Sequence, residues 1–358
     1  MTAWAHALAK ALNGERLSAG DALALSQCND LTLLGAAAHR MRLRHNPEPV
    51  VTYIVGRNIN YTNVCWVRCR FCAFYRVPGS PEGYVLSVEE VLRKVGEMVA
   101  HGGIEILLQG GLNPRLRIEW FEELFGAIKS QYGKDGVILH ALSPAEILYI
   151  AHISKLPLTE CLLRLRAAGL DSIPGGGAEV LTDRVRQQIA PLKTTADEWI
   201  GCMREAHRLG IRTTATLMFG SVDTWEDRIE HLLRIRALQD ETHGFTAFIP
   251  WSFQPDGTDL GGPKAGSFDY LKTLAISRIV LDNVPHFQVS WVTQGPRIAQ
   301  IALTYGADDF GSTMMEENVV SSAGCVFALG VEEIERLIRA AGYEPCRRTT
   351  QYTRLGRG

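Results

Sequence analysis

The stretch VTYIVGRNINYTNVCWVRCRFCAF (51–74) begins with a short apolar segment and ends with three cysteines, Cys65, Cys69 and Cys72. The apolar segment VTYIV (51–55) predicts a buried β-strand. The cysteines then fall in the loop at the carboxyl end of this strand. The fold class can be inferred from how often a strand followed by a loop recurs further along the chain.

Seven further strand candidates follow, and they are IEILLQ (104–109), VILHAL (137–142), LDSI (170–173), RTTATLMF (212–219), FTAFIPW (245–251), FQVSWVT (287–293) and ADDF (307–310). Amphipathic helices are predicted between many of them. The helix after residue 87 and the helix after residue 195 begin with capping boxes, Ser87 with Glu90 and Thr195 with Glu198. Near-continuous apolar strands that alternate with helices indicate parallel pairing, buried on both faces.

Eight such units predict an α/β fold, a (β/α)8 TIM-type barrel, and a doubly wound open sheet is the alternative. We expect residues 1–50 to form an N-terminal helical extension, residues 51–312 the barrel, and residues 313–358 a C-terminal cap packed on it. Loops that follow the strands meet at one rim of a barrel, where active sites of this fold lie. The three cysteines are therefore expected at that rim.

Composition narrows the class of protein. The chain has 358 residues, 46% of them hydrophobic, and a formal net charge of −2. This charge argues against nucleic-acid binding by bulk electrostatics. No apolar run is long enough for a membrane helix, so we expect no membrane association and a cytoplasmic location. In that setting the eight cysteines are expected to be mostly reduced.

The cysteine spacing C-x3-C-x2-C predicts a metal site with an open position. A structural zinc site needs four protein ligands, and ferredoxin-type clusters are held by four cysteines. An iron–sulfur cluster on three thiolates leaves one iron free to bind a small molecule. The alternative is that Cys161, Cys202 or Cys325 supplies the fourth ligand, which would make the metal site structural and leave no open position.

With Phe71 as the aromatic residue before Cys72, the motif resembles the signature of the radical S-adenosylmethionine (SAM) superfamily. The resemblance implies a [4Fe–4S] cluster on the three cysteines, SAM as the second cofactor, and a one-electron donor such as flavodoxin or ferredoxin. It also implies cofactor contacts from rim residues, namely Phe71, Gln109, Gly110, Gly111, Ser143 and Glu179.

The wider resemblance is to the radical enzymes of the futalosine route to menaquinone. It is carried by RNINYTNVC (57–65), LLQGGLNP (107–114), AGLDSIPGGGAE (168–179), GFTAFIPWSFQP (244–255) and FGSTMMEENVVSSAG (310–324). The stretches IPWSFQP and RALQDETHGF favour the ring-closing member of the group, an oxidoreductase that forms a carbon–carbon bond. Aminofutalosine synthase and the two halves of the deazaflavin-cofactor synthase are alternatives, because they share the cysteine loop.

The reaction that this resemblance implies is a ring closure on a nucleoside-type substrate. An adenosyl radical removes hydrogen from C4′ of the ribose, the carbon radical adds to an aromatic ring, and one electron and one proton are lost. Base candidates at strand ends are His140, Asp308 and Asp309, although His140 could instead be a buried structural histidine. Candidates for substrate binding are Arg57, Trp251 and Arg297.

Overall fold

The strands of the computed structural model, which describes residues 2–356, form two parallel sheets. The strands are β1 (Val50–Ile54), β2 (Gly56–Asn60), β3 (Glu105–Gln109), β4 (Ile138–Ala141), β5 (Ser172–Ile173), β6 (Arg212–Phe219), β7 (Phe245–Ser252), β8 (His286–Phe287), β9 (Asp309–Ser312) and β10 (Glu344–Arg347). In the larger sheet the strands follow in chain order from β2 to β8. In the smaller sheet β1 lies between β10 and β9.

The two sheets join into a (β/α)8 barrel of the TIM type. Strands β1 and β2 flank Val55, and they pair with β9 and with β3 respectively. On the far side, β8 meets β9 through a bridge between Gln288 and Asp309. A doubly wound sheet reverses its strand order at one point, and the unbroken order from β2 to β8 does not. The expected barrel is confirmed, and the doubly wound alternative is wrong.

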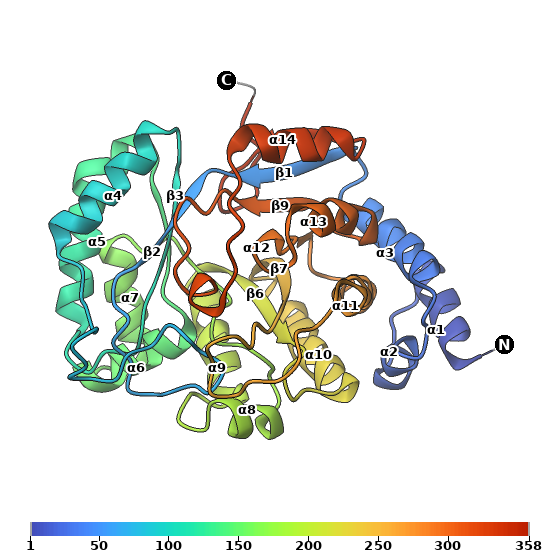
Figure 1. Cartoon of the computed structure of the whole chain (residues 1–358), viewed down its shortest axis with the longest axis horizontal. Helices are drawn as coiled ribbons and strands as arrows, with labels where there is room; N and C mark the ends of the chain where they lie inside the picture. Colours follow the sequence, from blue (N-terminus) through green and yellow to red (C-terminus); the bar gives the residue numbers. More distant parts are fainter. Residues whose placement is uncertain (1, 357–358) are drawn as a thin grey trace.

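Helices surround the strands (Figure 1). They are α1 (Ala3–Leu12), α2 (Ala19–Leu25), α3 (Leu31–His45), α4 (Val88–Ala100), α5 (Ile118–Tyr132), α6 (Pro144–Ser154), α7 (Leu158–Ala168), α8 (Asp183–Ile189), α9 (Ala196–Arg208), α10 (Trp225–Thr242), α11 (Ser267–Val280), α12 (Trp291–Gln294), α13 (Pro296–Ala302) and α14 (Val331–Ala340). Capping boxes start α4, α6, α9 and α10, where a side chain satisfies a free backbone N–H at the helix end.

One predicted strand is largely replaced by a helix. The stretch 287–293 reads as a strand because it alternates apolar and polar residues, but β8 ends at Phe287 and α12 begins at Trp291. The indole Nε1 of Trp291 donates a hydrogen bond to the carbonyl oxygen of Ser312, 3.1 Å away. The ring of Trp291 is buried. Because this tertiary packing outweighs the local preference, the strand propensity of the stretch is overridden.

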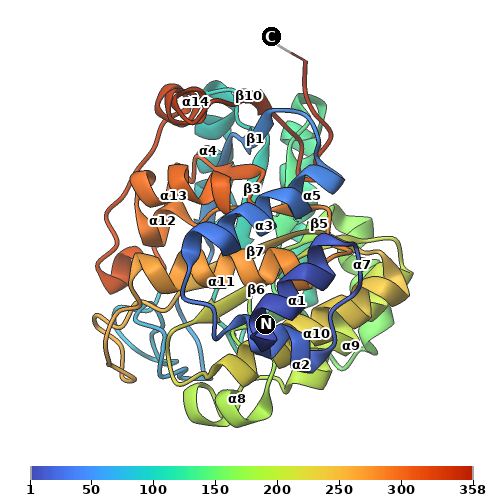
Figure 2. The same ribbon diagram turned by 90° about the vertical axis from the view of Figure 1, so that its right-hand side faces the viewer.

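The two ends of the chain lie against opposite parts of the barrel. Helix α3 packs along α11, as Figure 2 shows, and α14 lies close to β1 (Figure 1). After α14, strand β10 pairs with β1 in register, Val50 opposite Glu344. None of the helices within residues 2–356 is both long and apolar enough to cross a membrane.

Candidate functional site

The loop after β2 holds the three predicted cysteines close together. Its two arms are joined by a hydrogen bond from the backbone N–H of Cys65 to the carbonyl oxygen of Arg76, at 2.8 Å. Cys65 and Cys69 are buried and Cys72 is half-buried. The pKa of Cys69 is raised to about 12, chiefly by burial; the charge of Lys193 opposes this shift, whereas Glu179 and the neighbouring thiols of Cys72 and Cys65 contribute to it. The loop therefore brings the three thiols into one another's electrostatic range.

Two glycines in the turn after β3, Gly110 and Gly111, allow this loop to approach. A Cβ atom on Gly111 would lie 2.4 Å from the carbonyl oxygen of Val64 and 2.8 Å from Cβ of Cys65. A Cβ on Gly110 would lie 2.8 Å from the ring of Tyr61. No side chain fits at such distances. In this structure the glycines therefore admit the cysteine loop itself, a role that the resemblance did not imply.

A buried carboxylate fixes the same turn. Glu146 accepts hydrogen bonds from the hydroxyl of Tyr61 at 2.8 Å and from the N–H groups of Gly110 and Ser143 at 2.9 and 2.7 Å. Ser143, an expected cofactor contact, instead caps α6 and bonds the N–H of Glu146. Its side chain is outside the cavity described next, so its placement indicates a supporting role.

A cavity of about 260 Å³ occupies the barrel interior. It adjoins the cysteine loop, because Glu179 in its wall is near enough to Cys69 for the charge of Glu179 to raise the pKa of that thiol. Its wall includes side chains from β2, β3, β4, β6 and β7 and from segments after β5, β8 and β9. The residues of the cavity wall include Asn58, Asn60, Glu105, Gln109, His140, Gly176, Glu179, Trp251, Glu317, Arg348, Thr350 and Tyr352. Gln109, Glu179 and Trp251, all predicted from the sequence, are among them.

Glu179 carries the clearest unmet hydrogen-bonding capacity near the cysteines. Its Oε1 accepts from Nζ of Lys193 at 2.8 Å. Its Oε2 is buried and has no hydrogen-bond partner, although the guanidinium of Arg186 lies within ion-pair range at 3.6 Å. Although burial opposes it, the charges of Glu179 and Cys69 raise the pKa of Lys193, which therefore stays protonated. The same Lys193 ammonium lies 5.5 Å from the ring centre of Phe71. Phe71 and Glu179 thus meet at one cation beside the cysteine loop.

The three base candidates are placed unfavourably for that role. His140 lines the cavity, but burial and then the charge of Arg348 lower its pKa to about 3, which makes it a weak base. Its Nδ1 lies 2.6 Å from the hydroxyl of Ser172. Asp308 accepts hydrogen bonds from His286, and Asp309 from Arg348, with both carboxylates buried outside the cavity wall.

The two arginines predicted to bind substrate lie outside the cavity. Arg57 points away from it and pairs with Glu97 and Glu316, at 2.6 and 2.8 Å. Arg297 is exposed near the start of α13. A residue in a strand alternates between inside and outside by position, and Arg57 falls on the outer face of β2. This placement argues against both expected roles.

Two groups of cavity residues were missed by sequence reasoning. Asn58 and Asn60 alternate inward along β2, and the Oδ1 atom of each is buried without a partner. Glu317, beyond β9, accepts a hydrogen bond from Nδ2 of Asn58 at 2.6 Å. The period-2 pattern of GRNIN was the available signal for the asparagines. Glu317 had no comparable signal, because it comes from the distant segment after β9.

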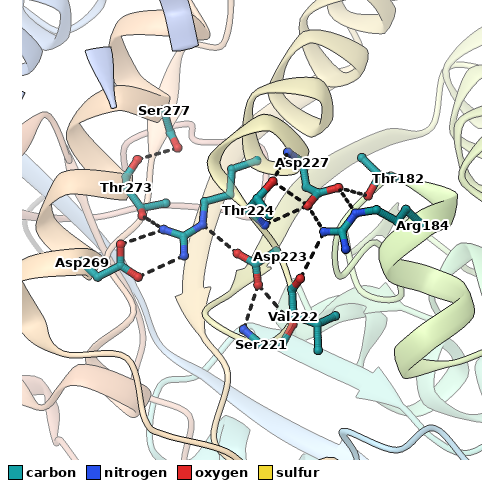
Figure 3. Close-up of polar contacts among 11 residues, drawn as sticks. Thr182, Arg184, Ser221, Val222, Asp223, Thr224, Asp227, Asp269, Thr273 and Ser277 are labelled. Atoms are coloured by element: carbon teal, nitrogen blue, oxygen red, sulfur yellow. Dashed lines mark hydrogen bonds and ion pairs between the residues drawn. The ribbon is translucent and has the colours of Figure 1, made fainter. Parts of the chain in front are cut away.

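A polar cluster stiffens the rim beyond β6 (Figure 3). Arg228 of α10 donates to Asp223 at 2.7 Å, to Asp269 at 2.7 Å and to Thr273 at 2.9 Å. Arg184 of α8 pairs with Asp227, which also completes the capping box of α10. The cluster ties α8, α10 and α11 together and lies outside the cavity wall, so it supports the rim and does not contact the cavity.

Comparison with known proteins identifies the family. Residues 59–235 match the model of the "Radical SAM superfamily" and residues 242–356 that of the "CofH/MqnC C-terminal region". The cyclic dehypoxanthine futalosine synthase of Halalkalibacterium halodurans is 48% identical over 96% of this chain and 93% of its own. Its namesake from Streptomyces coelicolor is 45% identical over 97% and 88%.

Other relatives and a solved structure also match. The aminodeoxyfutalosine synthase of Thermus thermophilus is 40% identical over 96% of this chain and 93% of its own. The crystal structure of methylornithine synthase shares the fold, with a TM-score of 0.74 at 18% identity over 95% of this chain and 97% of that one. The chain belongs to the radical SAM superfamily, and it is similar over nearly its whole length to two cyclic dehypoxanthine futalosine synthases.

Proposed function

We propose that this chain converts dehypoxanthine futalosine to its cyclic product by forming a carbon–carbon bond inside the barrel. The observation that carries the proposal is a walled cavity whose Glu179 lies near Cys69 of the three-cysteine loop and whose wall holds polar atoms without hydrogen bonds. The identity to two synthases of that name supports it. The family implies a [4Fe–4S] cluster and SAM as cofactors.

The residues present fit these two cofactors. Cys65, Cys69 and Cys72 would hold three irons of the cluster, since the other five cysteines make their contacts elsewhere or lie in other elements. Within residues 2–356 no group of three His, Cys, Asp or Glu side chains is arranged to hold a metal ion. A cluster separates its cysteine ligands more widely than one ion does, because irons and sulfides lie between them. Oε2 of Glu179, which has an ion-pair partner in Arg186 but no hydrogen bond, would accept a hydrogen bond from SAM.

When bound, the two cofactors supply a 5′-deoxyadenosyl radical. The barrel wall excludes water and other hydrogen donors from the reacting carbons. Asn58 and Asn60 offer buried amide oxygens that match ribose hydroxyls, and Trp251 provides an apolar wall. These residues hold the ribose against the aromatic ring at a distance suited to bond formation.

Glu317 is the proposed acceptor of the proton that leaves when the ring regains aromaticity. Burial raises its pKa, which makes its carboxylate a stronger base than usual. Its other oxygen, Oε1, accepts from the N–H groups of Val319 and Val320 at 2.6 and 2.9 Å, so the side chain is held in place. His140, with its lowered pKa, is the weaker choice.

The test is anaerobic reconstitution with iron and sulfide, followed by dithionite, SAM and dehypoxanthine futalosine. We expect a product two hydrogens lighter by mass spectrometry, and 5′-deoxyadenosine beside it. Cys69→Ala should abolish both, whereas Cys346→Ala, in the distant β10, should abolish neither. Substrate left unchanged by a protein that cleaves SAM would overturn the assignment in favour of a sister enzyme. Bound zinc with no nucleoside product would overturn the radical chemistry itself.

Glu317→Gln tests the base separately. We expect product formation to fall about 100-fold while 5′-deoxyadenosine is still released. Its neighbour Glu316 lies outside the cavity wall and pairs with Arg57 and Lys94, so Glu316→Gln is the matched control. Equal product formation by both variants would remove Glu317 from the mechanism.

A further inference from the structure

The segment after β10, residues 348–356, is called the C-terminal tail here. It forms the floor of the cavity, at the end opposite the cysteine loop. After β10, the backbone N–H of Arg348 donates to the carbonyl oxygen of Tyr53 at 2.9 Å. The hydroxyl of Thr350 donates to Oε2 of Glu105, the first residue of β3, at 2.6 Å. Arg348, Thr350 and Tyr352 all line the cavity. The tail therefore enters the barrel from the end where its strands begin.

The ring of Tyr352 is held from two directions. It stacks on His286 with ring centres 4.1 Å apart and an angle of 9° between planes. The guanidinium of Arg348 lies 3.9 Å from the ring centre. Arg348 is itself fixed by two hydrogen bonds to Asp309, at 2.5 and 2.8 Å. A backbone φ of 63°, uncommon for a bulky residue, completes this constrained placement.

The hydroxyl of Tyr352 takes no part in the contacts that hold its ring. It is buried and lacks a hydrogen-bond partner, although part of the residue remains exposed. A buried polar group without a partner destabilises the folded chain. Phenylalanine would make the same stack and the same cation–π contact without that penalty. Burial also raises the pKa of Tyr352 well above its ordinary value, so at neutral pH the group is a protonated donor.

We propose that the Tyr352 hydroxyl donates a hydrogen bond to an acceptor oxygen of the bound nucleoside substrate, at the end turned away from the cysteine loop. The C-terminal tail then acts as the floor that sets the depth and orientation of the substrate. This inference rests on the proposed function, because it takes dehypoxanthine futalosine as the molecule in the cavity.

The test compares Tyr352→Phe with Tyr343→Phe in the full-length holoenzyme. Tyr343 lies just before β10, and its hydroxyl makes only a long bond of 3.4 Å to the carbonyl oxygen of Leu303. For Tyr352→Phe we expect the Kd and KM for dehypoxanthine futalosine to rise about tenfold. We also expect the thermal midpoint of the substrate-free protein to be unchanged or higher. Tyr343→Phe should leave substrate affinity within twofold of the wild type.

The outcomes separate this inference from the proposed function. Wild-type turnover combined with unchanged substrate affinity in Tyr352→Phe would overturn the inference alone. So would a loss of affinity accompanied by a lower thermal midpoint of the substrate-free protein, since that indicates a structural role. A wild-type holoenzyme that neither binds nor converts dehypoxanthine futalosine would overturn both.

Discussion

Replacing Gly111 by alanine is expected to displace the cysteine loop. The added Cβ would lie 2.4 Å from the carbonyl oxygen of Val64, about 1 Å short of the 3.4 Å at which ordinary contact begins. Both the oxygen and the carbonyl carbon, 2.7 Å away, belong to the backbone and cannot swing aside as a side chain could. Overpacking of this kind typically costs about 1–3 kcal/mol.

The larger effect should be on function, because the displaced loop carries Cys65. A shift of about 1 Å in a reacting or ligating group can lower activity about 100-fold. We therefore expect Gly111→Ala to bind less iron after anaerobic reconstitution and to release 5′-deoxyadenosine about 100-fold more slowly. Iron and sulfide assays, chromatography of the nucleoside and thermal unfolding measure the three quantities.

Gly126→Ala is the matched control. Gly126 lies in α5 and is exposed, and a Cβ atom there would have no neighbour within 4 Å. Because alanine favours helix over glycine, this variant should gain about 0.5–1 kcal/mol of stability and keep its iron. Full iron content and wild-type SAM cleavage in Gly111→Ala would refute the close-approach argument.

Three further predictions follow from buried and exposed charges. Asp309→Asn leaves the buried guanidinium of Arg348 without its charge partner and should lower the free energy of unfolding by about 3–5 kcal/mol in denaturant titrations; a loss below about 1 kcal/mol would contradict this. Arg297→Ala should leave the substrate KM within twofold, since the residue is outside the cavity, and a tenfold rise would restore its expected role. Burial lowers the pKa of His140 and of His231 to about 3, below the value in the unfolded chain, so the unfolded chain binds more protons than the folded one. The free energy of unfolding should therefore decline as pH falls from about 6.5 towards 3, and denaturant midpoints unchanged between pH 7 and 5 would contradict this.

The barrel and its cysteine rim were predictable because their signals are local. Apolar strands such as 212–219 and the capping boxes of α4 and α9 depend on neighbouring residues only, and β6, α4 and α9 formed as expected. The stretch 287–293 misled the prediction because its strand-like alternation is overridden by the burial of Trp291. Local pattern therefore suffices where no distant contact competes with it.

The composition of the cavity wall was predictable only in part. Gln109 and Trp251 lie at the carboxyl ends of β3 and β7, and Glu179 lies in the segment after β5, so strand order was enough to place them at the rim. Glu317 and Tyr352 reach the wall from segments that no periodicity connects to the strands that they meet. Arg57 shows the converse error, because one residue's difference in register decides whether a strand side chain faces inside or outside.

The pairing of β1 has a consequence for how the chain is made. Its two partners, β9 and β10, begin at Asp309 and Glu344, more than 250 residues downstream. During synthesis the first strand therefore emerges long before either neighbour exists, and the ring stays open until nearly the whole polypeptide has left the ribosome. Contacts of such sequence separation form slowly, because a long loop must be closed first. Because β9 is the strand that closes the ring, nascent chains that stop before Asp309 should remain unclosed, protease-sensitive intermediates.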